Sequence, residues 1–196
     1  AGDPEAAEIA FGGVLRFFRT LEANASFHER GLVAEAAFRL GEIARHRYLR
    51  IELAYPLEKL RALLEQKCTQ LLSAQNRYLR AIRFGDPELV AIAGIKMGSL
   101  YEDLYVSVTE LETPVDLTPE QVEIYEEEVR KKVAILLKKA IRIYEKSLMV
   151  GRRLEASELW LEKLETALER LKSLYLASEA AFLIPRAQVE HRLRSI

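Results

Sequence analysis

The amino-acid sequence predicts an all-α protein of about six long helices, paired as antiparallel hairpins that stack as a solenoid. No stretch of the chain alternates apolar and polar residues with the period of two that is typical of strands. Nine glycines and six prolines are few for 196 residues, so long helical segments are uninterrupted. An internal repeat, the third observation, indicates that the helices form copies of one unit.

Turn and helix-start signals set the order of the helices. Tyr55-Pro56 marks a corner, because the residue before a proline disfavours helix. Asp86 and Thr118 each precede a proline and a glutamate, which is typical of a capped helix start. Thr118 also opens a capping-box sequence, and Ser157 is expected to cap the last helix. The expected helices cover about residues 3–22, 27–54, 56–84, 88–111, 119–150 and 157–176, followed by a C-terminal tail at 177–196.

The internal repeat is visible without gaps. Residues 32–41 align with residues 89–98, and five of the aligned positions are identical. Residues 74–85 align with residues 140–151 at an offset of 66 positions instead of 57. The longer loop at 112–118 accounts for this difference, because loops tolerate insertions. A duplication is therefore the best explanation of the pattern.

The duplication predicts a single domain over residues 1–196, with hairpins at about 27–84 and 88–150 between the flanking helices. One helical hairpin cannot bury its apolar face alone, so neighbouring hairpins are expected to stack. Small residues would let the helix backbones approach each other, and aromatic residues would fill the space between them. These scaffold residues are Gly41, Gly98, Ala74, Ala140, Tyr78 and Tyr144.

The same residues resemble the motif of the tetratricopeptide repeat (TPR) family. The first helix of that family carries a large apolar residue, then Gly and, three positions later, an aromatic residue. Met97-Gly98-x-x-Tyr101 fits this pattern, and Leu40-Gly41-x-x-Ala44 fits it except at Ala44. The second helix carries Ala, an aromatic residue, a small residue and then a turn proline. The matching sets are Ala74, Tyr78, Ala81 and Pro87, with Ala140, Tyr144 and Ser147 as the second copy.

The resemblance covers about residues 31–155 and departs from the family in length. A standard TPR unit has about 34 residues, whereas these hairpins have roughly 60. In this respect the chain resembles the divergent, long-helix repeats of bacterial cell-envelope machinery, such as motility, pilus and secretion complexes.

The TPR family binds partners along the concave face of its first helices, so the resemblance implies a groove for a protein or peptide. Spacing from Gly41 and Gly98 places ten residues in that groove. The candidates are Glu35, Phe38, Glu42, Arg45, His46, Ile92, Ile95, Ser99, Glu102 and Asp103. In the alternative interpretation, the three apolar candidates are ordinary core residues and the charged ones only solvate a helix face.

The resemblance implies a non-catalytic scaffold or adaptor that binds other proteins within a larger bacterial assembly. A second hypothesis is a structural module that associates with itself, because the apolar segment 177–184 would either cap the last hairpin or dock onto a neighbouring molecule. A third is a helical bundle that binds a ligand or catalyses a reaction. The compartment is open between periplasm and cytoplasm, since Ala1 is expected to begin a processed or excised fragment.

Composition and motifs argue against several other classes. The 29 basic and 30 acidic residues give a net charge of −1, which argues against a nucleic-acid binder. No run approaches the roughly 20 apolar residues that a membrane span needs. Glu42-x-x-x-His46 lacks a third metal ligand, and Cys68 is expected in the core. Since no catalytic motif occurs, we predict no catalytic residue, no metal and no cofactor.

Overall fold

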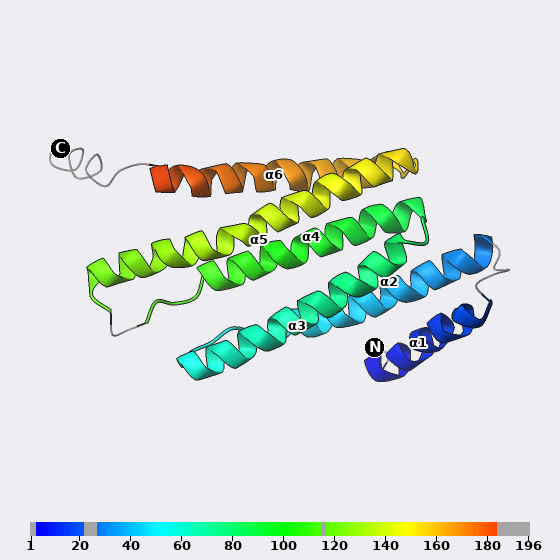
Figure 1. Cartoon of the computed structure of the whole chain (residues 1–196), viewed down its shortest axis with the longest axis horizontal. Helices are drawn as coiled ribbons and strands as arrows, with labels where there is room; N and C mark the ends of the chain where they lie inside the picture. Colours follow the sequence, from blue (N-terminus) through cyan, green and yellow to red (C-terminus); the bar gives the residue numbers. More distant parts are fainter. Residues whose placement is uncertain (1–2, 22–26, 115–116, 184–196) are drawn as a thin grey trace.

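The computed structural model describes residues 3–21, 27–114 and 117–183. This part of the chain contains six helices and no strand, so the predicted all-α class is confirmed. The helices run side by side along the length of an elongated molecule (Figure 1). They are α1 (Pro4–Leu21), α2 (Phe27–Leu49), α3 (Leu57–Ile82), α4 (Pro87–Thr109), α5 (Pro119–Arg153) and α6 (Glu158–Leu183).

The predicted helix starts at Asp86 and Thr118 are confirmed by their caps. The Asp86 carboxylate accepts a hydrogen bond of 2.8 Å from the backbone N–H of Leu89. Thr118 and Gln121 exchange the two hydrogen bonds of a capping box, each side chain accepting from the other residue's backbone N–H. These contacts satisfy N–H groups that have no partner inside the helix. Short-range signals therefore fix the first turns of α4 and α5.

Three predicted helix ends differ from the structure. Helix α2 stops at Leu49 instead of Ala54, because the following backbone turns and the Ile51 carbonyl accepts a hydrogen bond of 3.0 Å from the Lys67 ammonium. Helix α5 continues past Val150 through the buried Gly151. Helix α6 continues to Leu183, beyond the predicted end near residue 176. The rest of the predicted tail, residues 184–196, lies outside the described residues.

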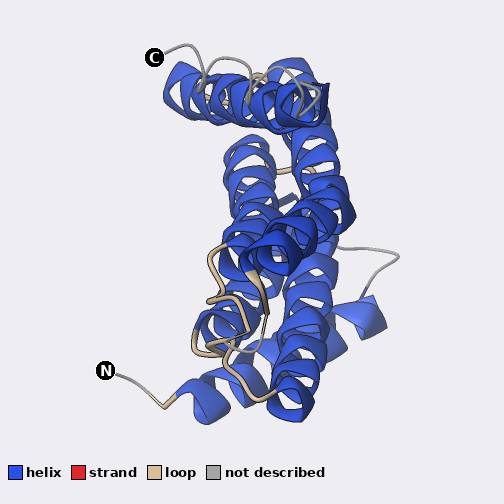
Figure 2. Cartoon of the chain, turned by 90° about the vertical axis from the view of Figure 1, so that its left-hand side faces the viewer, coloured by secondary structure: helices blue, strands red, loops and turns tan. Residues whose placement is uncertain are grey.

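The helices form hairpins that stack in chain order. Helix α2 packs most extensively against α3, and α4 against α5. Helix α1 covers the outside of the first hairpin, and α6 packs on α5 at the other end of the stack. An end-on view shows this progression from α1 at the bottom to α6 at the top (Figure 2). Helix α4 also contacts α2, the first helix of the preceding hairpin, and α6, the helix that follows its own hairpin.

The duplicated small and aromatic residues form the closest contacts within each hairpin. Tyr78 and Tyr144 are fully buried, and their rings lie against Gly41 and Gly98. A Cβ atom at Gly41 would lie 2.6 Å from the Tyr78 ring. In the second hairpin a Cβ atom at Gly94 would likewise collide with the side chain of Ser147. These glycines are required by the close approach of the neighbouring helix, as the sequence predicts for Gly41 and Gly98; Gly94 was not predicted.

Two polar contacts join elements that are distant in the sequence. The Glu8 carboxylate of α1 pairs with Arg47 of α2 and with Arg77 of α3, each at 2.7 Å. Partial burial raises the pKa of Glu8, but the hydrogen bonds from the two guanidinium groups outweigh this effect and lower it overall. The hydroxyls of Tyr55, in the connection before α3, and of Tyr125 in α5 lie 3.0 Å apart.

Replacing Tyr55 with phenylalanine is expected to destabilise the protein by about 1 kcal/mol near neutral pH, through the lost hydrogen bond. Burial and the hydrogen bond with Tyr125 raise the pKa of Tyr55 to about 12 in the folded protein, against an ordinary value of 10.0. Its stabilising effect is therefore complete below about pH 10 and declines as the pH rises toward 12. Urea denaturation of both proteins at pH 8 to 11 should show the difference in unfolding free energy narrowing; a constant difference would contradict this prediction.

Candidate functional site

The structure places the ten predicted groove residues on α2 and α4, which contact each other in the stack. The apolar members pack inward. Phe38 is buried and its ring lies 5.5 Å from that of Tyr78, measured between centroids. Ile92 and Ile95 are partly buried and pack against the same core. These three side chains therefore contribute to the interior, as the alternative interpretation expects.

Three predicted carboxylates join helices to one another. Glu42 accepts a hydrogen bond from the Tyr78 hydroxyl of α3 and lies 3.6 Å from the Lys96 ammonium of α4. Glu102 pairs with Arg170 of α6. The Asp103 carboxylate of α4 lies 3.4 Å from the ammonium of Lys67 of α3. These acidic groups hold the stack together, so their substitution would affect folding as well as any binding.

The other predicted residues have local or solvent contacts. Glu35 pairs at 2.6 Å with Arg39 on the same helix, and His46 is exposed. The Ser99 hydroxyl donates to the Lys96 carbonyl. The Nε atom of Arg45 is buried without a hydrogen-bond partner among the described residues. Glu35 and His46 are thus the groove candidates best suited to test this face.

Lys67 is a buried cation at the junction of α2, α3 and α4. Its side chain is 5% exposed, and its ammonium donates to the Ile51 carbonyl at 3.0 Å. The same ammonium lies 3.4 Å from the Asp103 carboxylate and 4.3 Å from the centre of the Tyr48 ring. The Tyr48 hydroxyl lies 2.7 Å from Asp103. Burial, and then the hydrogen bond to Asp103, raise the pKa of this tyrosine far above its ordinary value.

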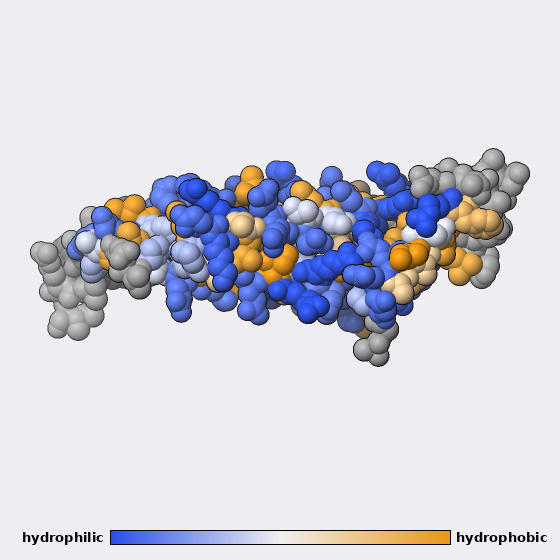
Figure 3. Space-filling model, turned by 90° about the horizontal axis from the view of Figure 1, so that it is seen from below, coloured by the Kyte–Doolittle hydropathy of each residue, from blue (hydrophilic) through white to orange (hydrophobic). Residues whose placement is uncertain are grey.

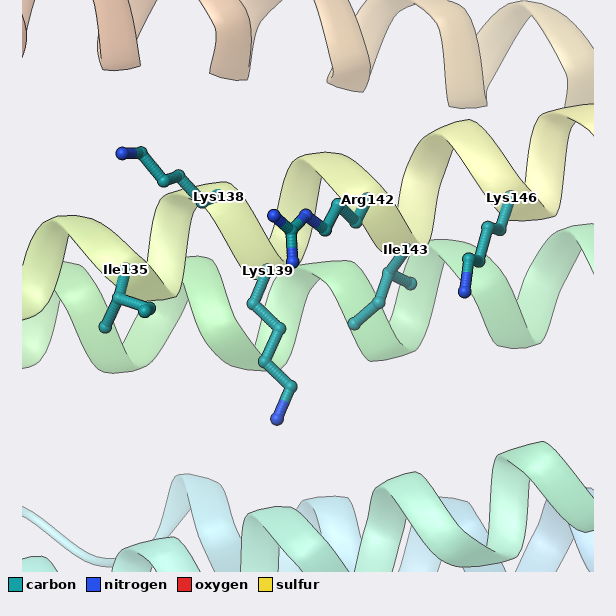
Figure 4. Close-up of a pocket in the computed structure, with 6 residues that line it drawn as sticks. All are labelled: Ile135, Lys138, Lys139, Arg142, Ile143 and Lys146. Carbon is teal, nitrogen blue, oxygen red and sulfur yellow. The ribbon is translucent and has the colours of Figure 1, made fainter.

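A groove that the sequence analysis did not single out runs along α5. It has a volume of about 370 Å³. Figure 4 shows Lys139 and Lys146 extending toward the side of α3, and Lys138 toward the side of α6. Ile135 contributes an apolar surface and is 66% exposed. We name this feature the α5 groove; its lining residues are Ile135, Lys138, Lys139, Arg142, Ile143 and Lys146.

Two cations of the α5 groove contact aromatic rings, and the other two have no described partner. The Lys139 ammonium lies 4.5 Å from the centre of the Tyr101 ring, and that of Lys138 lies 5.1 Å from the Tyr175 ring. In the described part of the chain, no carboxylate lies within 4.0 Å of the four cationic groups. Glu145, the acidic residue nearest in sequence, pairs with Lys172 of α6 at 2.7 Å. No contacting carboxylate therefore offsets the positive charge of the groove, and the Glu179 carboxylate of α6 acts on Lys138 only from a longer distance.

The spacing of these cations is unfavourable for an isolated helix. Lys138, Arg142 and Lys146 follow one another at intervals of four residues. Side chains at that spacing are neighbours on the helix surface, and like charges there cost about 0.2–0.5 kcal/mol per pair. Lys138 contacts the Tyr175 ring, but no carboxylate contacts this row among the described residues. Because unfavourable local sequence choices are typical of functional sites, the α5 groove is the candidate functional site.

A second groove between α5 and α6 extends the same surface. It also has a volume of about 370 Å³, and it shares Lys138 and Arg142 with the α5 groove. Tyr175 and Leu176 of α6 contribute apolar surface to it, and Leu176 is largely exposed. The second groove is also lined by Glu145 and Lys172, so the combined surface carries five cationic side chains and one carboxylate beside its apolar side chains.

The sequence contains a signal for this site. Residues 134–153 include six basic residues and one acidic residue, although the whole chain is nearly neutral.

Cys68, which the sequence places in the core, is partly buried and packs against it, and burial raises the pKa of its thiol.

Among the described residues, no group of three or more His, Cys, Asp or Glu side chains is arranged to hold a metal ion. None of the described helices is both long enough and apolar enough to cross a bilayer. Comparisons with protein-family models, with curated proteins and with solved structures found no match to this chain.

Proposed function

We propose that this protein is a non-catalytic scaffold, built as a TPR-like stack of long hairpins, that binds a partner protein. The contacts of α4 with both α2 and α6 support the TPR-like arrangement, as do the glycine and tyrosine contacts repeated in both hairpins. The binding role depends on one observation, the cationic and apolar surface of the α5 groove, whose cations have no carboxylate within 4.0 Å among the described residues. A place in a larger bacterial assembly follows from the sequence resemblance.

Self-association is the second candidate, and exposed apolar side chains near the start of the chain favour it. Ile9 of α1 is 70% exposed, and Phe17 and Leu32 are also largely exposed. The view from below, the side on which α1 lies, shows hydrophobic side chains in patches between hydrophilic ones (Figure 3). Light scattering over a wide concentration range separates this candidate from a monomeric scaffold.

Affinity capture with three forms of the protein tests the scaffold proposal. The wild type, the α5 variant Arg142→Glu/Lys146→Glu and the α2 variant Glu35→Gln/His46→Ala are immobilised and exposed to a lysate of the source organism. Any protein retained by the wild type is identified by mass spectrometry, purified and tested for direct binding. These four residues have exposed or partly exposed side chains and do not join helices, so both variants should fold.

Each result has a defined meaning. A purified partner that binds the wild type and loses at least tenfold in affinity with one variant supports the scaffold and assigns its face. Loss with the α2 variant alone would support the groove predicted from the sequence instead of the α5 groove. If the protein only forms oligomers and no retained protein binds directly, the scaffold proposal is wrong and self-association replaces it.

A further inference from the structure

We infer that the α5 groove binds an acidic amphipathic helix of the partner protein. This inference rests on the proposed scaffold function and names the chemistry of the ligand. The groove combines two features that such a helix matches: four cationic groups without a carboxylate within 4.0 Å among the described residues, and the exposed apolar side chain of Ile135 beside them.

The length of the groove fits a short helix. Its lining runs from Ile135 to Lys146 on a single helix, which corresponds to about 17 Å at 1.5 Å per residue. A partner helix lying along α5 would therefore contact it over about three turns. The adjoining groove toward Tyr175 and Leu176 widens the apolar surface on one side.

Two parallel rows of side chains define what the ligand must carry. By their positions on α5, Lys138, Arg142 and Lys146 form one row at intervals of four residues, and Ile135, Lys139 and Ile143 form the neighbouring row. Within the first row, Lys138 extends toward the side of α6 and Lys146 toward the side of α3 (Figure 4). A helical ligand presents side chains with the same periodicity. Carboxylates four residues apart would face the cationic row, and leucine or isoleucine beside them would cover the isoleucines. Such a ligand removes the repulsion within the cationic row when it binds.

Other anionic ligands fit this surface less well. Phosphate chains contact a cationic surface mainly through charge and would leave the exposed Ile135 without an apolar partner. An anionic membrane offers a flat surface, whereas these residues line a groove of about 370 Å³. A second copy of this chain would also be a protein ligand for the groove. A measurement of the oligomeric state distinguishes this case from binding of a different partner protein.

A synthetic peptide tests the inference directly. The probe is a fluorescein-labelled helical peptide of about 18 residues with glutamate at every fourth position and leucine beside it. Its affinity for the full chain is measured by fluorescence anisotropy. We expect Arg142→Glu/Lys146→Glu to weaken binding about tenfold or more, because attraction at two sites becomes repulsion. Raising the salt concentration should weaken binding to the wild type and have little effect on the variant.

Matched controls separate the groove from a general charge effect. Lys59→Glu/Arg61→Glu makes the same change in net charge at exposed positions of α3 and should change the affinity less than twofold. A peptide with glutamine in place of glutamate should bind at least tenfold more weakly to the wild type. Circular dichroism and the urea midpoint of both variants should match the wild type, because Arg142 and Lys146 are exposed.

The inference is overturned if both double variants bind the acidic peptide equally well, or if the glutamine peptide binds as tightly as the acidic one. It is also overturned if a DNA duplex or an anionic vesicle binds the wild type while the peptide does not. These results leave the scaffold proposal intact when a captured partner protein still binds directly. Failure of direct partner binding, together with self-association, would instead remove the scaffold proposal.

Discussion

Replacing Gly98 with alanine is expected to lower the free energy of unfolding by about 2–3 kcal/mol. The new Cβ atom would lie closer than 3.0 Å to three atoms of the Tyr144 ring. That ring is fully buried between α4 and α5, so it cannot swing out into solvent and the surrounding core must shift to accommodate it. Overpacking of this kind outweighs the gain of up to about 1 kcal/mol that alanine brings to a helix interior.

Urea denaturation measures this effect, and Gly31→Ala is the matched control. Gly31 also lies inside a helix, but among the described residues no atom beyond the adjoining backbone of its own helix lies within 4 Å of an added Cβ atom. That variant should be unchanged or more stable by up to about 1 kcal/mol. In the background of Tyr144→Leu, Gly98→Ala should lose most of its cost, because the clashing ring is absent. An undiminished cost in that background would refute the steric explanation.

Replacing Asp103 with asparagine is expected to destabilise the protein by about 2 kcal/mol. The substitution keeps the shape of the side chain and an acceptor for the Tyr48 hydroxyl, but it removes the charge facing Lys67. Because the Lys67 side chain is 5% exposed, its ammonium would remain buried without a counter-charge, which is costly. Asp103 itself is 40% exposed, so solvent screening keeps the expected loss below that of a fully buried pair.

A double-mutant cycle with Lys67→Met checks the cause. Methionine retains the apolar stem of the lysine and removes the buried charge. We expect Lys67→Met/Asp103→Asn to be less destabilised than the sum of the two single variants, by about 1 kcal/mol or more. Strict additivity of the unfolding free energies from urea denaturation would show that the two groups do not interact. The cycle also explains why Asp103 is a poor residue for testing a binding groove.

Features that depend on local sequence were predictable. Asp86 and Thr118 act on backbone groups within three residues, so their patterns are visible in the sequence. The paired contacts of Gly41 with Tyr78 and of Gly98 with Tyr144 were predictable because the duplication shows the same spacing twice. The stacking of neighbouring hairpins then stabilises the helices whose starts these local signals set.

Features that depend on distant partners were not predictable in the same way. The early end of α2 coincides with a hydrogen bond between Ile51 and Lys67, and nothing near Lys67 in the sequence shows that this lysine is buried. The α5 groove also depends on partners that are distant in the sequence. Its cations repeat every four residues in the sequence, but only the fold shows that Glu145 pairs with Lys172 and not with them. By contrast, Arg47 and Arg77 pair with Glu8 of another helix.

The order of the helix contacts has a consequence for how the chain acquires its structure. In the described part of the chain, each helix packs only against helices one or two places along the sequence. Such short-range topology lowers the entropy cost of the folding nucleus and is typical of fast folding. Either hairpin could serve as a nucleus onto which the other condenses. During synthesis, the first hairpin could therefore assemble before α4 and α5 leave the ribosome.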